Sequence, residues 1–186
     1  MSRSALASGL LVLLAIPHAG PADAQQEGPA LNDARIAHIA VTANAIDIAI
    51  GEIAARKGSA ESVREFASLM ITDHTAVNEQ AAALAAELGV TPEDNAVSRS
   101  LREGADAAME ELGEASGEAF DRAYLAREVA YHRAVLQALD DTLIPGATND
   151  RLRALLQQAR GAIAAHLEHA ERLRGSPGHA AHEGRP

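Results

Sequence analysis

The sequence predicts an all-α protein built as a four-helix bundle, and three observations support this. Apolar residues make up 47% of the 186 residues, whereas aromatic residues make up only 2%. Such a core packs through alanine and branched aliphatic side chains, which suits close-packed helices better than a sheet. Long segments carry apolar residues at alternating spacings of three and four, and none alternates with the period of a strand. Breaks rich in glycine, proline and capping residues separate these segments.

The first 24 residues differ from the rest and predict a secretory signal peptide. Arg3 precedes a short apolar run over residues 10–16, and Ala22-Asp23-Ala24 matches the small-residue pattern of a cleavage site. We therefore expect residues 1–24 to be removed by cleavage near Ala24, which leaves a mature protein in the periplasm or outside the cell. We expect no later segment to be apolar enough to cross a membrane, and hence no membrane insertion.

The mature chain is expected to hold one helical domain between two short disordered ends. Residues 25–31 form the lead-in and residues 175–186 form the tail, so the bundle occupies residues 32–174. The net charge of −10 leaves no basic surface for nucleic acid. The lack of cysteine excludes disulfides, thiolate catalysis and sulfur-bound metal clusters. Nothing in the sequence names a protein partner.

The first two helices are predicted to form an antiparallel hairpin. Asn32 or Asp33 can cap the first helix, which ends at Gly58. Ser59 can cap the second helix, which runs to about Leu88. A break this short forces the chain to turn back on itself. The apolar stripe of the first helix is Ile36, Ile39, Ala40, Ala43, Ile46, Ile50 and Ile53. That of the second is Val63, Phe66, Met70, Val77, Ala81, Leu84 and Leu88, with His74 in its middle.

The second pair of helices follows a long connection over residues 90–116. This connection carries a short helix of its own, roughly Ala96–Leu112, and is long enough to run the length of the bundle. Helices two and three can therefore lie parallel, as in ferritin-like bundles with one long crossover. The third helix spans roughly Glu118–Leu143, and Thr148, Asn149 or Asp150 caps the fourth. The apolar positions of these two helices include Phe120, Tyr124, Leu125, Val135, Leu136, Leu139, Leu152, Leu155, Ala159, Ile163, Ala170 and Leu173.

Four polar residues fall on these apolar stripes, one in each long helix: Asp47, His74, His132 and His166. At about 1.5 Å of rise per residue, Asp47 and His74 lie roughly 15 and 21 Å from the first hairpin turn, and the second hairpin repeats these heights. The four side chains should therefore meet in one layer of the core. Burying polar groups without partners costs a few kcal/mol each, so we expect this layer to have a specific role.

A metal site is the leading interpretation of the layer. Three imidazoles and one carboxylate suit zinc, iron, copper or nickel better than calcium or magnesium, which prefer oxygen ligands. Asp73, Asp121, Tyr124 and Glu128 lie nearby in the sequence and are candidates for further ligands or for side chains that orient the ligands. Glu128 stands one helical turn before His132 on the same face.

The same segments resemble a known bacterial family of exported, ferritin-like proteins, called domain of unknown function 4142 and often labelled outer membrane proteins. The matching motifs are Asp47-Ile-Ala-Ile-Gly-Glu-Ile-Ala54, Val63-Arg-Glu-Phe-Ala67, Met70-Ile-Thr-Asp-His-Thr75, Phe120-Asp-Arg-Ala-Tyr124, His132 and His166-Leu167, within residues 32–174. The resemblance implies a ferritin-like four-helix bundle in an exported protein. This chain has Asp47 where the family usually has Glu, and it lacks the paired Glu-x-x-His motifs of di-iron proteins, because Ile71 and Val129 occupy those positions.

The sequence leaves three interpretations open, from different classes of function. The first is a metal-binding bundle with a redox or stress-protective role. The second is a non-catalytic structural or interaction protein, whose buried polar layer only fixes the register of the helices. A third interpretation is a carrier of a small ligand in a cavity between Ala-rich helices. No nucleophile–base pair, phosphate loop or dinucleotide motif appears, so we assign no catalytic residue.

Overall fold

The computed structural model describes residues 31–176, and within them the chain is entirely helical, as predicted. The predicted signal peptide, the predicted lead-in up to residue 30 and the predicted tail from residue 177 lie outside the described residues. The helices are α1 (Asp33–Lys57), α2 (Glu61–Leu88), α3 (Ala96–Glu114), α4 (Gly117–Ala138), a π-helical turn η1 (Leu139–Leu143), α5 (Ile144–Gly146) and α6 (Asp150–Arg174).

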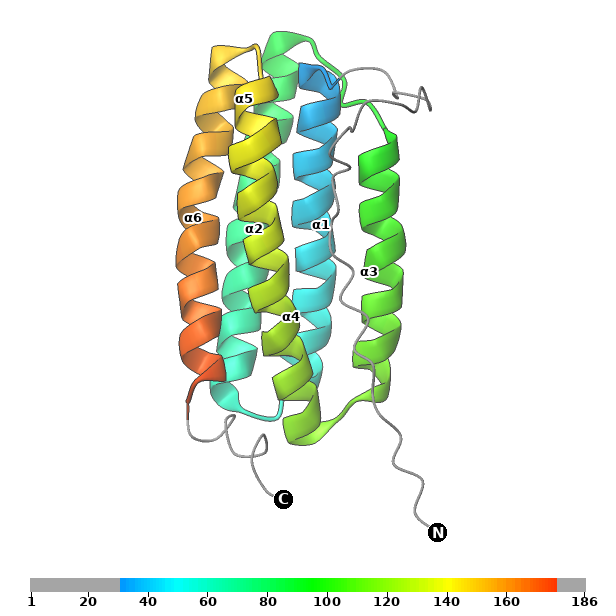
Figure 1. The fold of residues 1–186 in the computed structure, drawn as a ribbon, viewed down its shortest axis with the longest axis vertical. Helices are drawn as coiled ribbons and strands as arrows, with labels where there is room; N and C mark the ends of the chain where they lie inside the picture. The colour runs from blue at the N-terminus through cyan, green and yellow to red at the C-terminus, as the bar shows by residue number, and fades with distance from the viewer. Residues whose placement is uncertain (1–30, 177–186) are drawn as a thin grey trace, which may run out of the picture.

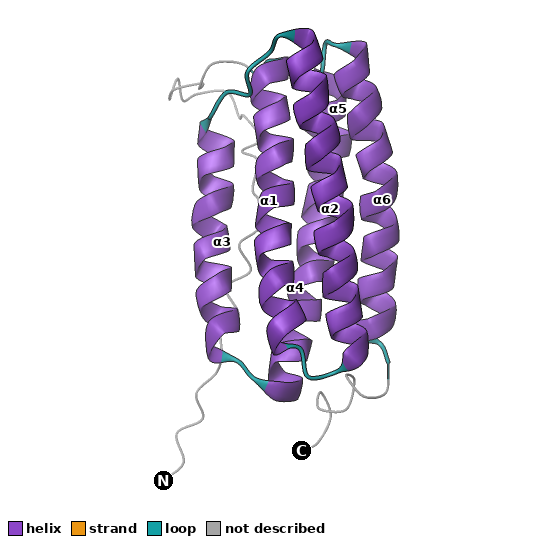
Figure 2. Cartoon of the chain, turned by 180° about the vertical axis from the view of Figure 1, so that it is seen from behind, coloured by secondary structure: helices purple, strands orange, loops and turns teal. Residues whose placement is uncertain are grey.

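Four long helices, α1, α2, α4 and α6, pack side by side along their lengths, and α3 lies outside this group (Figure 1). In Figure 1, α1 and α6 run downward while α2 and α4 run upward. The chain therefore returns along α3 before α4 begins, so that α2 and α4 point in the same direction. The view from behind shows α3 alongside α1, away from α6 (Figure 2). The most extensive helix pairings are α1 with α2 and α4 with α6.

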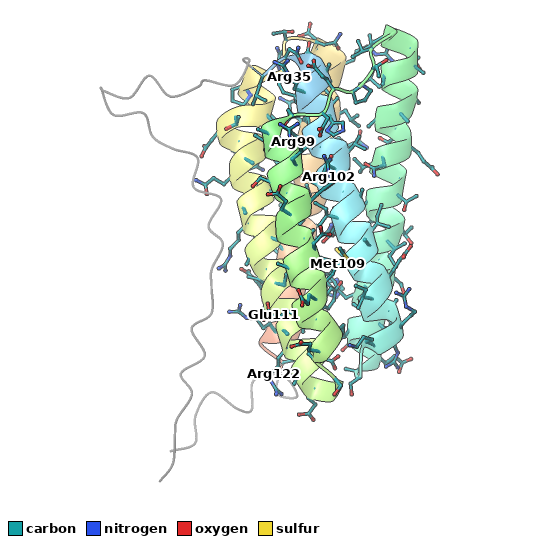
Figure 3. All side chains as sticks on the ribbon, turned by 90° about the vertical axis from the view of Figure 1, so that its right-hand side faces the viewer. Arg35, Arg99, Arg102, Met109, Glu111 and Arg122 are labelled. Carbon is teal, nitrogen blue, oxygen red and sulfur yellow. The ribbon has the colours of Figure 1, made fainter. Side chains whose placement is uncertain are left out.

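Helix α3 covers one side of α1 and is stabilised at its start by a charged cluster. Asn95 caps α3, because its side chain accepts the amide of Ser98. Asp94 accepts hydrogen bonds from Arg99 at 2.9 Å and from Arg102 at 2.8 Å. Figure 3 faces α3 and shows both arginines on its upper half and Met109 further down. Met109 packs against the apolar core, so α3 is attached to the bundle along its length.

The start of α2 is stabilised by a different helix, not by the expected Ser59. The cap position is Ala60, whose side chain offers no hydrogen bond. The two carboxylate oxygens of Asp121 on α4 accept the backbone amides of Ser59 and Ala60, both at 2.8 Å. The prediction that Ser59 caps α2 is therefore wrong. By contrast, Asn32 and Asn149 cap α1 and α6, as the sequence indicates.

The apolar core consists of two clusters, one above and one below a polar layer, in the orientation of Figure 1. The lower cluster includes Ile50, Val63, Phe66, Met70, Phe120, Tyr124, Leu125, Val129 and Ala170. The upper cluster includes Ile36, Ile39, Leu139, Leu143, Leu152, Leu156 and Ile163. Along α1, α4 and α6, the change from one cluster to the other takes place at the positions of the buried aspartate and histidines.

Helix α1 is apolar enough to qualify as a membrane span by length and composition. Its mean hydropathy reaches 1.4 over 18 residues, and among the described helices no other meets this criterion. The expectation that no segment after residue 24 would do so is therefore wrong. In the structure 44% of that stretch is buried inside the protein, and its apolar residues contribute to both core clusters. A core helix of this kind meets the same criterion without crossing a membrane.

We expect Asp121→Ala to destabilise the protein by about 1–2 kcal/mol, because two partly buried backbone amides, those of Ser59 and Ala60, lose a charged acceptor. Urea unfolding of the full chain measures the change. Asp106→Ala, an exposed aspartate on α3, is the matched control and should change stability by no more than about 0.5 kcal/mol. Equal effects of the two substitutions would contradict the role of Asp121 at the start of α2.

Candidate metal centre

The polar layer brings together Asp47, His74, His132 and His166, one from each of α1, α2, α4 and α6. These side chains are nearly inaccessible, with exposed fractions of 1%, 5%, 1% and 4%. The three imidazole rings surround one point, since their centroids lie 5.3–5.8 Å apart. One ring nitrogen from each histidine lies within 4.8 Å of those of the other two. The three imidazoles thus converge, and Asp47 lies beside two of them, His74 and His132.

A neighbouring acceptor contacts one of the two ring nitrogens of each imidazole. The Nδ1 of His74 lies 2.9 Å from Oδ1 of Asn44, and Nδ2 of Asn44 donates a hydrogen bond to Oδ1 of Asn78. The Nδ1 of His132 donates to the backbone carbonyl of Glu128 at 2.9 Å. The Nε2 of His166 donates to the carboxylate of Asp73 at 2.8 Å. Each acceptor fixes the orientation of its ring and the nitrogen that carries the proton.

The opposite ring nitrogens are buried and make no hydrogen bond to any residue among 31–176. They are Nε2 of His74, Nε2 of His132 and Nδ1 of His166. Burial lowers the pKa of His132 to about 4 and also lowers the pKa of His166. Both rings are therefore neutral at pH 7, and each presents a lone pair on its inner nitrogen. This is the state in which histidine binds a metal.

Asp47 is the charged member of the layer. Burial acts to raise its pKa, but His74, His132 and Arg127 together lower it to about 2, so the carboxylate stays ionised. Its Oδ2 lies 2.9 Å from Nε2 of His74 and 3.9 Å from Nε2 of His132. Within the described part of the chain, neither oxygen makes a hydrogen bond of acceptable geometry. Oδ2 of Asp47 and Nε2 of His74 are therefore in direct contact and form a buried aspartate–histidine pair, although the angle between them is poor for a hydrogen bond.

Glu128 adds a second buried carboxyl group to the layer. One ligating atom from each of Asp47, Glu128 and His132 lies within 4.8 Å of the other two. The guanidinium of Arg127 donates to Oε1 of Glu128 at 2.8 Å and lies 3.6 Å from Oδ1 of Asp47. Burial and the charge of Asp47 raise the pKa of Glu128 well above its usual range. Its Oε2 has no hydrogen-bond partner among the residues described.

The other candidate residues have different roles. Asp73 lies at the edge of the layer and orients His166. Asp121 on α4 contacts Ala60 at the start of α2, which is 14 residues before His74 and so roughly 20 Å from it along that helix. Tyr124 lies one turn before Glu128 and packs beside the rings of Phe66 and Phe120. Its buried hydroxyl has no hydrogen-bond partner in residues 31–176. The structure therefore brings Asp73 and Glu128 to the layer but not Asp121.

Two residues that the sequence analysis did not single out also contribute. Asn44 contacts His74 and fixes its ring. Arg127 balances the charge of Asp47 and donates to Glu128, and its guanidinium lies over the ring of Tyr131. Asn44 stands three residues before Asp47, so a polar residue on the same helical face was an available signal. Arg127 looks like an ordinary surface charge in the sequence, because an arginine beside a glutamate is common on exposed helices.

We expect the metal-free protein at pH 7 to hold His132 with its proton on Nδ1 and His166 with its proton on Nε2. Their acceptors, a backbone carbonyl and a carboxylate, require these tautomers. Long-range ¹H–¹⁵N NMR of the imidazole rings distinguishes the two forms. The same tautomer in both rings, or rapid exchange between tautomers, would contradict the arrangement described above.

Comparison with known proteins identifies the family of the chain. No curated protein and no solved structure matches it. A family model described as a domain of unknown function (DUF4142) matches residues 18–173, and so covers every helix of the structure except the last residue of α6. The chain therefore belongs to the DUF4142 family.

Proposed function

We propose that this protein is an exported, ferritin-like helical bundle that binds a divalent transition-metal ion in the polar layer of its core. One observation carries the proposal. Three inner imidazole nitrogens and both oxygens of Asp47 are buried, and in the described residues none makes a hydrogen bond of acceptable geometry, although Oδ2 of Asp47 lies 2.9 Å from Nε2 of His74. Each unsatisfied buried group costs about 1–3 kcal/mol, and one bound cation satisfies all of them at once.

The inner nitrogens of His74, His132 and His166 and the carboxylate of Asp47 are the proposed ligands. A donor set of three nitrogens and one oxygen suits zinc, iron, copper or nickel. Donors around one such ion at about 2.0–2.2 Å are roughly 3.3 Å apart, so the three nitrogens, which lie within 4.8 Å of one another, must move closer together when the ion binds. Glu128, which Arg127 holds beside Asp47, supplies one more carboxylate if the ion takes a fifth ligand.

The path of the chain supports the ferritin-like part of the proposal. Helices α2 and α4 run in the same direction and are joined by a long return along α3 (Figure 1). The chain has Ile71 and Val129 three residues before His74 and His132, where paired Glu-x-x-His motifs would place glutamate. We therefore propose a single ion instead of a di-iron centre. A redox or stress-protective role follows if the ion is iron or copper, because zinc has no redox chemistry.

A structural role without an ion is the alternative. The bonds from His74 to Asn44, from His132 to the Glu128 carbonyl and from His166 to Asp73 each fix one ring, and such bonds can specify how four helices align. This alternative accounts for the outer nitrogens of the rings and for the contact of His74 with Asp47, but it leaves the inner nitrogens of His132 and His166 without a role. For this reason we prefer metal binding.

Metal binding should raise the melting temperature of the metal-free protein, because an ion that binds only the folded state stabilises it. We expect a rise of several degrees and one equivalent of bound ion with at least one of zinc, iron, copper and nickel. Calorimetry and metal analysis of untagged protein measure both. The proposal fails if none of the four ions binds or shifts the melting temperature.

The matched variants are His132→Gln and His179→Ala. The first keeps a polar side chain of similar size in the layer, and circular dichroism establishes that it folds. We expect it to lose the thermal shift, whereas the second, outside the described residues, should keep it. Loss of binding only in His179→Ala would show that the ion binds in the C-terminal segment instead of the core.

The export part of the proposal depends on the N-terminal sequence and is tested separately. Arg3, the apolar run over residues 10–16 and Ala22-Asp23-Ala24 support a cleaved signal peptide. We expect the protein recovered from the periplasm without detergent to begin at Gln25, which intact mass spectrometry measures. A mass that retains residues 1–24, or recovery only in detergent, would contradict export as a soluble protein.

A further inference from the structure

The upper half of the bundle contains an apolar cavity with a volume of about 90 Å³. Its wall comes from the inner faces of α1, α2 and α6 and from the region where α4 passes into η1. Alanine, leucine, valine and isoleucine make up nearly all of this wall. Many of these side chains, such as Ala40, Val77 and Leu155, face the interior of the bundle and are still only half-buried, because they border the cavity.

The cavity leads from the end of the bundle to the polar layer. Asp33, Val90 and Asn149 border it at the upper end. Asn44 lies 11 residues after Asp33 on α1, which corresponds to roughly 16 Å. Asn44 and Ile163 border the cavity and also two smaller cavities of about 10 Å³ each, which are lined by His74, His132 and His166. A molecule at the inner end of the large cavity is therefore next to the imidazoles.

The distribution of aromatic residues explains why this half is incompletely filled. Phe66, Phe120 and Tyr124 fill the lower cluster, whereas the upper cluster has no aromatic side chain among the described residues. Alanines face the cavity at several successive levels instead: Ala37, Ala40 and Ala43 on α1, Ala81 and Ala85 on α2, and Ala159 on α6. Backbones held apart by leucines at neighbouring positions leave space beside these small side chains.

We propose that this cavity binds a small, uncharged, apolar molecule of a few heavy atoms, at a site bordering the polar layer. The apolar wall offers few partners for water or an ion, and cavities of this kind stay dry and take up apolar molecules. A cavity of about 150 Å³ holds benzene, so 90 Å³ suits a molecule the size of xenon, dioxygen or a short alkane. Binding of this molecule requires the cavity and does not require a metal ion in the polar layer. If the ion proposed above is present, such a molecule gains access to it through an apolar passage.

Xenon is the probe, applied under pressure to the full chain without metal, and methyl NMR is the readout. We expect saturable shifts of the Ile163 and Val135 methyl groups, which line the cavity, and none at Ile50 or Val63 in the lower cluster. Failure of the metal proposal leaves this result unchanged, because no ion is present. No saturable shift at Ile163, or equal shifts in both halves, would overturn the proposal.

Ala40→Leu and Ala45→Leu provide the matched pair on α1. Ala40 borders the cavity, so the larger side chain should fill it and weaken xenon binding at least tenfold. Ala45 is exposed on the side of α1 that faces α3, and its substitution should leave binding unchanged. Ala81→Leu on α2 repeats the test if Ala40→Leu does not fold. Full-strength binding to a folded, cavity-filled variant would overturn the proposed site.

Discussion

The constraint on which this structure depends is the cost of burying one carboxylate and three imidazoles in the middle of an apolar bundle. The protein offsets part of this cost by giving every ring one acceptor: Asn44 for His74, the Glu128 carbonyl for His132, and Asp73 for His166. Because these acceptors hold the outer nitrogens, the inner nitrogens converge with the carboxylate of Asp47. The hydrogen bonds that stabilise the buried rings therefore also orient nitrogen atoms that could hold a metal ion.

The layer also divides the core into two halves with different properties. Below it, Phe66, Phe120 and Tyr124 fill the space between the helices and exclude solvent. Above it, successive alanines leave an apolar cavity that ends at Asn44 and Ile163. A metal ion in the layer would thus rest on a closely packed base and be reached from one side, by small apolar molecules. Arg127 balances the negative charge of Asp47 and donates a hydrogen bond to Glu128 at the side of the layer.

The helices and the convergence of the four polar residues followed from periodicity, because each long helix buries a single stripe and an odd polar residue on that stripe must enter the core. Contacts between side chains of different helices are harder to predict from the sequence, because they depend on how the helices pack. Ser59 has the residue type of a cap, but the carboxylate of Asp121 reaches the start of α2 from another helix. Arg127 reaches Asp47 only because α4 packs beside α1. The apolar stripe of α1 describes only its inner face, whereas the helix as a whole is apolar enough to qualify as a membrane span by length and composition.

The most direct test of the central claim is the crystal structure of the metal-loaded protein, with anomalous diffraction recorded at the absorption edge of the bound metal. The account predicts one anomalous peak within about 2.0–2.3 Å of Nε2 of His74, Nε2 of His132 and Nδ1 of His166, with an oxygen of Asp47 completing the site. The outer nitrogens should keep their bonds to Asn44, the Glu128 carbonyl and Asp73. A peak elsewhere in the molecule, or a layer in which the inner nitrogens only contact one another or water, would contradict the claim.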